Sequence, residues 1–313
     1  MKRFVRTCIK ALLLALALCG AAAVQAERVE VIASESLPAF REASQALVDE
    51  LGRLGVPRSD VRAMSLSDVA QHETAFDDVK LVITLGAKAL SQVMAVAGHP
   101  PVVAALIPRQ GFERIVSNVG KKGNMSATAV YLDQPFARQL NLLRLVAPNA
   151  RVLGVVWGPE SLAQRSQLLA VLRGTGLQLR ESEIAGADSL VAGLKSAISD
   201  ADMFLAVPDS QVFNAATISD ILMMTYRARV PVLAFSPAYT KAGAMASLFT
   251  SPQQIGFQAA NMAVAYLQSG NLPAPDYPGD YAVSVNEYVA RSMGFSLDAQ
   301  RLRVQLAGQE KKP

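Results

Sequence analysis

The sequence predicts an α/β protein made of two doubly wound, Rossmann-like lobes, joined by a hinge that the chain crosses several times. Short apolar runs rich in β-branched residues alternate with longer amphipathic stretches, which is the pattern of a parallel sheet with helices on both faces. The pattern occurs in two successive blocks, and LVITLGAKAL (81–90) in the first resembles MFLAVPDSQV (203–212) in the second. In each block proline introduces the next strand, in HPPVVAALIP (99–108) and RVPVLAFSP (229–237). Two blocks of similar length suit two lobes better than one large sheet.

Each element follows from this alternation, taken in chain order. The predicted strands of the first block are 29–33, 61–65, 81–84 and 102–107, and its predicted helices are 38–54, 67–72 and 87–96. The predicted strands of the second block are 152–156, 177–183, 203–207 and 231–234, and its predicted helices are 135–146, 162–173, 189–199 and 212–228. Beyond residue 234 we predict strands at 244–248 and 282–285 and helices at 252–267 and 287–293.

These last elements are too small to form a third domain, so each is expected to return to a lobe already built. The predicted division is 27–128 plus 247–278 for the first lobe, 129–246 plus 279–306 for the second, and 307–313 as a solvated tail. The chain is then expected to cross between the lobes near 123–130, 236–246 and 278–283. Such repeated crossings act as a hinge.

Residues 1–26 have the three parts of a secretory signal peptide. A basic start is followed by an apolar stretch at 11–18 and by the small-residue ending Val24-Gln25-Ala26, which suits cleavage before Glu27. We therefore expect a periplasmic protein. The alternatives are an uncleaved anchor, for which the apolar run is short, and a lipoprotein anchored through Cys19, for which Leu18 is a poor preceding residue.

Removal of this leader changes the charge and the cysteine content of the chain. The net charge of +4 disappears, because four of the 30 Lys and Arg residues precede the apolar stretch, while 26 acidic residues remain. A neutral chain has no electrostatic footprint for nucleic acid or for an anionic membrane surface. Both cysteines, Cys8 and Cys19, lie in the leader, so the mature protein is expected to form no disulfide.

The motifs of several chemistries are absent from the sequence. There is no GxGxxG turn and no Walker loop for a nucleotide cofactor, and no GxSxG elbow for a nucleophilic serine. His72 and His99 are the only histidines, and His72-Glu73 fails to continue as HExxH because Phe76 occupies the fifth position. We therefore expect no enzyme activity, no metal and no cofactor.

Several ordered segments together resemble a known family. They include GNMSATAVYLDQPFARQLNLLRLVAPNARVLGVVWGPES (123–161), AGAMASLFTSPQQIGFQAANMAVAYLQSG (242–270) and VSVNEYVARSMGFSL (283–297). They resemble the substrate-binding proteins of ABC transporters, in the branch associated with tryptophan and tyrosine uptake, which have the type I periplasmic-binding-protein fold. The chain departs from this pattern at Asn124-Met125-Ser126-Ala127 and at Ile107-Pro108-Arg109.

The resemblance implies a monomeric periplasmic protein that closes over a small polar, amino-acid-like molecule and delivers it to a membrane permease. The alternative is a sensory receptor of the same fold that signals to a membrane histidine kinase or chemoreceptor, because closure of the lobes serves both purposes. An exported enzyme is the third hypothesis.

Candidate ligand contacts lie where predicted strands end, since ligands bind beyond the carboxyl ends of strands in open α/β sheets. Thr84, Gly86 and Ala87 end a strand and open a helix, where free N–H groups favour a carboxylate, unless this is an ordinary turn. Arg109 after Pro108 is expected to pair with a carboxylate or to lie in solvent.

The equivalent positions of the second block offer the remaining candidates. Asp209 after Pro208 is expected either to receive a ligand ammonium or to cap the next helix. The other candidates are strand-end or crossover residues that form either cleft walls or packing between the lobes: Tyr131, Gly158, Ser161, Phe235 and Ser236.

Overall fold

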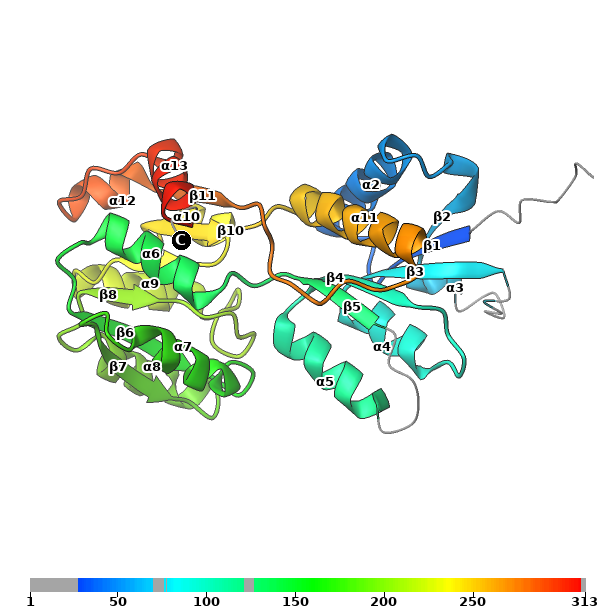
Figure 1. Ribbon diagram of the computed structural model, residues 1–313. Coiled ribbons are helices and arrows are strands. Elements are labelled where there is room, and N and C mark those ends of the chain that lie inside the picture. Colours follow the sequence, from blue (N-terminus) through cyan, green and yellow to red (C-terminus); the bar gives the residue numbers. More distant parts are fainter. Residues whose placement is uncertain (1–27, 70–75, 77, 121–126, 311–313) are drawn as a thin grey trace, which may run out of the picture.

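A computed structural model describes residues 28–69, 76, 78–120 and 127–310. They form two α/β lobes side by side, each with a mainly parallel sheet between two layers of helices (Figure 1). The predicted fold class is confirmed. The predicted leader and His72 lie outside the described residues. Within the described ranges no helix is both long enough and apolar enough to cross a bilayer.

Lobe 1 is built on a five-stranded parallel sheet with the order β2-β1-β3-β4-β5. Its strands are β1 (Arg28–Ala33), β2 (Val61–Ser65), β3 (Val79–Leu85), β4 (Val102–Ile107) and β5 (Ala127–Tyr131). Its helices are α2 (Pro38–Arg53), α3 (Leu66–Val69), α4 (Ala87–Ala95), α5 (Arg109–Gly120) and α11 (Pro252–Ser269). Helices α2 and α11 cover one face of the sheet, and α4 and α5 cover the other. Successive side chains of each strand therefore enter two different cores.

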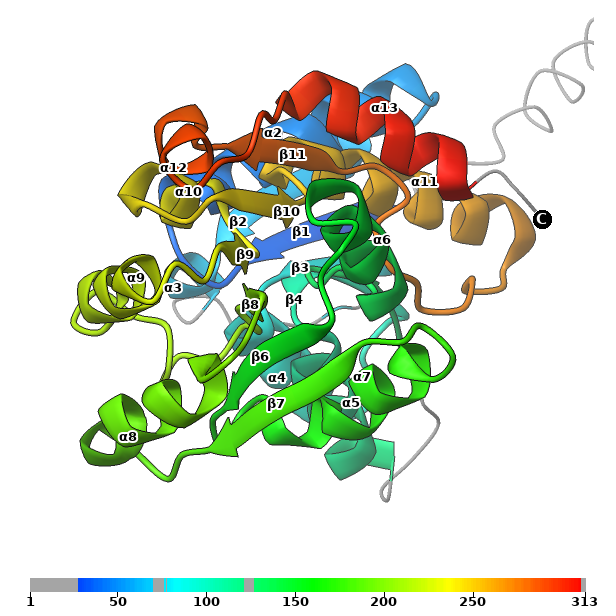
Figure 2. The same ribbon diagram turned by 90° about the vertical axis from the view of Figure 1, so that its left-hand side faces the viewer.

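Lobe 2 is built on a six-stranded sheet with the order β11-β10-β9-β8-β6-β7, in which only β11 is antiparallel. Its strands are β6 (Val152–Trp157), β7 (Gln178–Glu183), β8 (Met203–Leu205), β9 (Val232–Ala234), β10 (Ala246–Phe249) and β11 (Ala282–Val285). Its helices are α6 (Phe136–Val146), α7 (Arg165–Leu172), α8 (Ala187–Ile198), α9 (Ile218–Arg227), α10 (Pro237–Ala242), α12 (Glu287–Ser292) and α13 (Ala299–Glu310). Helices α6, α7 and α13 cover one face, with α13 beside α6 and β11 (Figure 2), and α8 and α9 cover the other.

Helix α11 shows how a late segment returns to an early lobe. It begins with a capping box, in which the Ser251 side chain accepts the N–H of Gln254 while the Gln254 side chain accepts that of Ser251, and it ends at Gly270 with a φ of 71°. Gly256 lets it pack closely on α2, because a Cβ there would lie 2.5 Å from the carbonyl oxygen of Ala43.

The chain crosses between the lobes three times, at 132–135 after β5, at 250–251 after β10, and at 278–281 before β11 (Figure 1). We refer to these segments as the first, second and third crossings. The third lies where the sequence predicts it. The second does not lie within 236–246, because β10 pairs with β9 and β11 and so belongs to lobe 2.

The first crossing also comes later than expected. The segment at 127–131 is strand β5, which pairs with β4 and carries lobe 1 three residues beyond the expected boundary at 128. Asp276, close to the third crossing, pairs with Val130 of the same strand. The first and third crossings therefore both start next to β5, at one edge of the lobe 1 sheet.

Two helices differ from the predictions. Helix α5 was not predicted, and it buries Phe112 and Val116 against the sheet. The helix expected at 212–228 begins at Ile218, because the Asn214 side chain accepts the N–H groups of Ala216 and Thr217 and forms a turn there.

The expected tail at 307–313 is also wrong over its first part. Helix α13 continues to Glu310, Leu306 is fully buried, and Glu310 bonds to lobe 2 side chains. The end of the described chain is therefore held by packing and by a charged pair.

Candidate functional site

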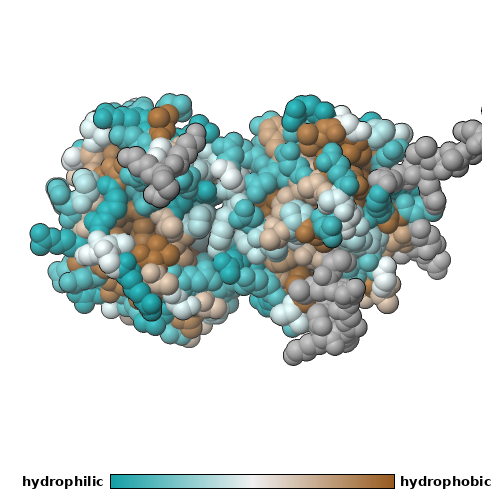
Figure 3. All heavy atoms as spheres, in the orientation of Figure 1, coloured by the Kyte–Doolittle hydropathy of each residue, from teal (hydrophilic) through white to brown (hydrophobic). Residues whose placement is uncertain are grey.

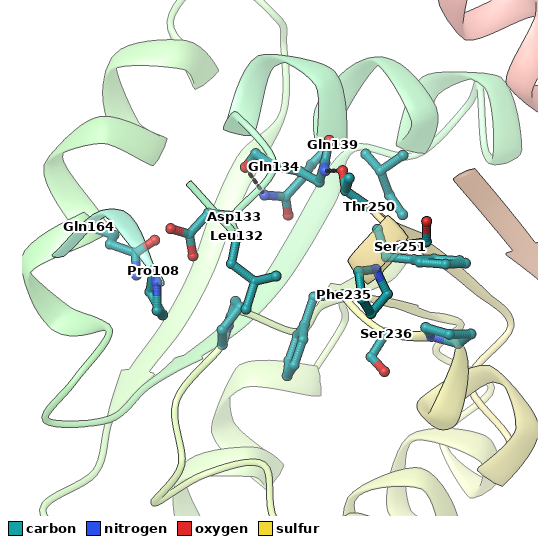
Figure 4. Close-up of a pocket in the computed structure, with 15 residues that line it drawn as sticks. Pro108, Leu132, Asp133, Gln134, Gln139, Gln164, Phe235, Ser236, Thr250 and Ser251 are labelled. Atoms are coloured by element: carbon teal, nitrogen blue, oxygen red, sulfur yellow. Dashed lines mark hydrogen bonds between the residues drawn. The ribbon is translucent and has the colours of Figure 1, made fainter. Parts of the chain in front are cut away.

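A cavity of about 530 Å³ lies between the lobes, beside the first and second crossings (Figure 4). Its walls come from strand ends of both lobes and from the crossings themselves. The apolar lining residues are Pro108, Leu132, Pro208, Phe235, Pro237, Leu248, Phe249 and Pro252. The polar lining residues are Asp133, Gln134, Gln139, Gln164, Ser236, Thr250 and Ser251. An apolar cavity of this size with a few polar groups has the character of a small-molecule site.

Pro108, Pro208, Phe235 and Ser236 are the predicted site residues that line this cavity. Pro108 follows β4 in lobe 1, whereas the other three follow β8 and β9 in lobe 2. The Ser236 hydroxyl accepts the N–H of Ala238 and caps α10, which holds the Phe235 turn in place. A molecule in the cavity therefore meets the carboxyl ends of strands from both lobes.

Asp133 is the only carboxylate among the cavity residues. Its Oδ2 atom accepts the backbone N–H of Arg109 at 2.5 Å, which fixes the carboxylate at the start of α5. Burial raises the pKa of Asp133 above its ordinary value. The negative charge of Glu113 also raises it, whereas the backbone N–H and the positive charge of Arg109 lower it. A half-buried carboxylate of this kind gains from a cationic partner, so Asp133 suits a ligand ammonium.

The lobes also touch directly beside the cavity. With its side-chain amide oriented to satisfy both neighbours, Gln110 of α5 donates to the carbonyl of Glu160 and accepts the backbone N–H of Gln164 at 3.1 Å. Gln110 belongs to lobe 1, while Glu160 and Gln164 belong to the loop after β6 in lobe 2. This contact links the lobes at the side where Asp133 and Gln164 lie (Figure 4).

The structure gives Asp209 a role within its own lobe. Its Oδ2 atom accepts the N–H groups of Glu160 and Ser161 and the Ser161 hydroxyl, and its Oδ1 atom accepts the N–H of Gln211. Asp209 is 3% exposed and Ser161 is fully buried. Gly158 allows this close approach, because a Cβ there would lie 2.5 Å from Asp209 Oδ2. None of these three residues lines the cavity, and the Asp209 carboxylate is occupied by hydrogen bonds within its own lobe, which we call the Asp209 clamp.

The predicted carboxylate site at the start of α4 does not line the cavity either. Thr84 is fully buried in the sheet, and its Oγ1 atom has no hydrogen-bond partner among the described residues. Gly86 has a φ of 89° and is packed against Ser34, whose hydroxyl accepts the N–H of Ala89. Ala87 is exposed at the helix start. The helix terminus is thus partly capped by its own lobe.

Arg109 and Tyr131 pack together beneath the cavity. The Arg109 guanidinium donates to the Tyr277 hydroxyl at 3.1 Å and to Glu113 at 2.7 Å, and these hydrogen bonds raise its pKa. Its Cζ atom lies 5.9 Å from the ring centroids of Tyr131 and Tyr277. Tyr131 is 7% exposed and makes edge contacts with Phe112 and Tyr277. Tyr131 does not line the cavity, and these ring contacts lie within lobe 1 rather than between the lobes.

Sequence reasoning missed most of the polar lining. Asp133 and Gln134 come two and three residues after β5, close to a strand end like the candidates chosen elsewhere, but this strand was not predicted. Thr250 and Ser251 were not chosen as candidates because the second crossing was predicted at 236–246, before these residues. Finding β5 and β10 correctly would have marked both pairs.

The outer surface near the hinge has a different character from the cavity walls. Figure 3 shows a waist between the lobes whose visible atoms belong mostly to hydrophilic residues. Over the described ranges there is no cluster of His, Cys, Asp and Glu that suits a metal ion. The candidate site is therefore the cavity between the two lobes.

Comparisons with known proteins agree with this architecture. The family model described as ABC transporter substrate binding protein matches residues 28–287. A search of curated protein sequences found no match. The fold is similar to a ligand-free, open substrate-binding protein with adhesive properties from Clostridium difficile, with 16% identity, a TM-score of 0.72, and coverage of 87% of this chain and 96% of that one.

Two other solved structures show the same fold. An ABC domain in complex with L-Trp from Streptococcus pneumoniae has 16% identity and a TM-score of 0.62, over 88% of this chain and 97% of that one. A conserved domain protein from Vibrio cholerae has 18% identity and a TM-score of 0.61 over the same shares. Because the family model spans most of the sequence, this chain belongs to the ABC transporter substrate-binding proteins, a family of binding proteins rather than enzymes.

Proposed function

We propose that this protein binds an amino-acid-like zwitterion with an apolar side chain in the cavity between its lobes. In this proposal it works in the periplasm after removal of residues 1–26 and delivers the ligand to an ABC permease. The observation that carries the proposal is the cavity itself, which places one half-buried carboxylate, Asp133, next to apolar walls and neutral polar groups.

Each part of such a ligand has a partner in the cavity. The Asp133 carboxylate suits the ammonium, because a buried ammonium without an anionic partner costs several kcal/mol. The ligand carboxylate is suited to the part of the cavity that is lined by Gln134 and by the start of α11, Ser251 and Pro252. The positive end of the helix dipole favours an anion there. Leu132 and Phe235 offer apolar surface to the side chain.

Closure of the lobes follows from the same geometry. Asp133 and Gln134 lie on the first crossing and Ser251 on the second, while Phe235 and Pro208 belong to lobe 2. A ligand that contacts all of them is bound more tightly when the lobes approach, so binding shifts the hinge toward closure. A permease that recognises both lobes then distinguishes loaded from empty protein. The complex with L-Trp in a protein of the same fold supports an amino acid as ligand.

Native mass spectrometry of protein purified from cells tests the proposal, because tight-binding receptors retain their ligand. We expect an added mass that matches an amino acid, and isothermal calorimetry with the twenty amino acids should then give one strong binder. Phe235→Ala should weaken that binder, whereas Phe257→Ala, on the exposed side of α11, should leave its affinity unchanged. Retention of a sugar or a metal, or no binding of any amino acid, contradicts the proposed ligand class.

A further inference from the structure

Arg138 lies just outside the cavity, and its guanidinium has several hydrogen-bond and ring partners. This α6 residue has a side chain only 10% exposed. Its Nη1 atom donates to the Gln134 side-chain oxygen at 2.7 Å and to the Pro278 carbonyl at 2.8 Å, and its Nε atom donates to Glu310. Its Cζ atom lies 4.3 Å from the ring centroid of Tyr281. One cation thus connects the first crossing, the third crossing and the last turn of α13.

The anion that balances Arg138 is itself held in place. Tyr281 donates its hydroxyl to Glu310 Oε2 at 3.0 Å. Burial and this hydrogen bond raise the pKa of Tyr281 to about 12, so the hydroxyl keeps its proton at neutral pH. Glu310 therefore accepts from both Arg138 and Tyr281, and the guanidinium has a fixed position relative to the hinge.

Hydrogen-bond chemistry then fixes the side-chain amide of Gln134, a buried residue of the cavity wall. A guanidinium only donates, so the Gln134 group that faces Arg138 must be its oxygen. On the other side, Thr250 donates its hydroxyl to the Asp280 carbonyl at 2.9 Å, so its Oγ1 atom must accept from Gln134 Nε2 at 2.6 Å. Rotation of the amide by half a turn would set its nitrogen against the Arg138 guanidinium and its oxygen against the Thr250 oxygen. Figure 4 shows the Thr250 side of this arrangement.

The fixed Gln134 amide affects what the cavity can bind. Only one of the two Gln134 Nε2 hydrogens is used by a neighbour in the described part of the chain. The fixed amide therefore keeps one N–H for a bound molecule, while its oxygen is turned toward Arg138 and accepts from it. A donor in this position binds a carboxylate and discriminates against a group that must itself donate, such as a carboxamide nitrogen.

We propose that Arg138 is a positioning residue for ligand recognition, which holds Gln134 as a hydrogen-bond donor and so makes the site selective for a free carboxylate over its amide. The inference rests on the proposed function, since it assumes a zwitterion in this cavity. It also gives α13 a part in recognition, because Glu310 at its end positions Arg138.

The test compares Arg138→Met with Arg303→Met. Arg303 is a matched control, because it also ties α13 to the third crossing, through the Tyr281 carbonyl and Asp280, but does not touch Gln134. Calorimetry measures the affinities of the twenty amino acids and of the carboxamide of the strongest binder. In Arg138→Met the acid should lose between about 10- and 150-fold in affinity, the effect of one hydrogen bond to a charged group, while the carboxamide changes little. Arg303→Met should keep the wild-type ratio.

Equal losses for acid and carboxamide in Arg138→Met, or equal changes of the ratio in both variants, overturn the proposal in favour of a purely structural role. Arg138→Lys should recover part of the selectivity, because it restores a donor next to Gln134.

A measurement without ligand separates this inference from the proposed function. Side-chain amide NMR signals of Gln134, assigned by their loss in Gln134→Ala, should show slow solvent exchange in the wild type and in Arg303→Met. In Arg138→Met the exchange should accelerate at least about tenfold. If no amino acid binds, the proposed ligand is wrong, and unchanged exchange in Arg138→Met then overturns the positioning role independently.

Discussion

Asp209→Ala decides whether this carboxylate binds ligand or holds lobe 2 together. In the structure it accepts four hydrogen bonds, from Glu160, from the N–H and hydroxyl of Ser161, and from Gln211, at 2.9–3.0 Å. Truncation removes the shorter hydrogen bonds of the fully buried Ser161, whose N–H and hydroxyl keep only the Gly158 carbonyl, at 3.2 and 3.4 Å, at about 0.5–1.5 kcal/mol each. Loss of the hydrogen bond from the Gln211 N–H adds about 1 kcal/mol. The free energy of unfolding should therefore fall by about 2–4 kcal/mol.

Trp157 provides the assay, because the single tryptophan of the chain is fully buried at the end of β6, next to this clamp. Urea unfolding followed by its fluorescence should show a lower midpoint for Asp209→Ala. Calorimetry on the folded variant should give a ligand affinity within about twofold of wild type. Asp202→Ala is the control, since this exposed carboxylate also accepts two backbone N–H groups in lobe 2 and water replaces it at little cost. An unchanged urea midpoint together with a tenfold loss of affinity would refute the clamp.

Four further predictions concern the cavity and its support. Asp133→Asn should weaken binding of the zwitterion by about 10- to 150-fold in calorimetry, and an unchanged affinity would remove Asp133 from the site. Because burial raises the pKa of Asp133, wild-type affinity should fall as the pH drops through that pKa, whereas Asp133→Asn should show no such step. In the protein without ligand, the stability changes with pH in the opposite direction to the affinity. The raised pKa gives stability that is present at acidic pH and lost as the pH rises through it, so Asp133→Asn should melt no lower than wild type at pH 7, and a lower melting temperature would contradict this. Gly158→Ala should cost about 1–3 kcal/mol in urea unfolding, because its Cβ would lie 2.5 Å from Asp209 Oδ2; a neutral effect would show that the clamp yields.

Much of the fold was predictable because its signals are local. The Ser251 capping box, the proline after it and Gly270 mark both ends of α11 within its own sequence. The apolar runs of β1, β3, β4 and β6 are buried on both faces of their sheets and so read as continuous hydrophobic strands.

The elements that were missed or assigned to the wrong lobe depend on distant partners. Helix α13 has little amphipathic pattern, and its end is held by Arg138, far away in the sequence. Strand β10 was predicted as a strand at 244–248, but it belongs to lobe 2 through its pairing with β9 and β11, which its own residues do not specify. Propensity alone does not decide such elements.

The candidate site was predictable only in part, for a related reason. Phe235 and Pro208 follow strands that were recognised, and they line the cavity. Asp209 and Asp133 both follow a strand of their lobe. Only the folded structure shows that the Asp209 carboxylate accepts hydrogen bonds from a neighbouring loop of lobe 2, whereas Asp133 lines the cavity. The type of residue at a strand end indicates what it can bind, and its neighbours in space decide whether it is free to do so.

A crystal structure of the protein with its co-purified ligand tests the central claim most directly. We predict an amino-acid-like molecule in the cavity between the lobes, with its ammonium within hydrogen-bond distance of Asp133, its carboxylate facing the Gln134 side-chain nitrogen, and its side chain against Phe235. A ligand bound instead between Gly86 and Asp209, without contact to any residue of the cavity, would contradict the account.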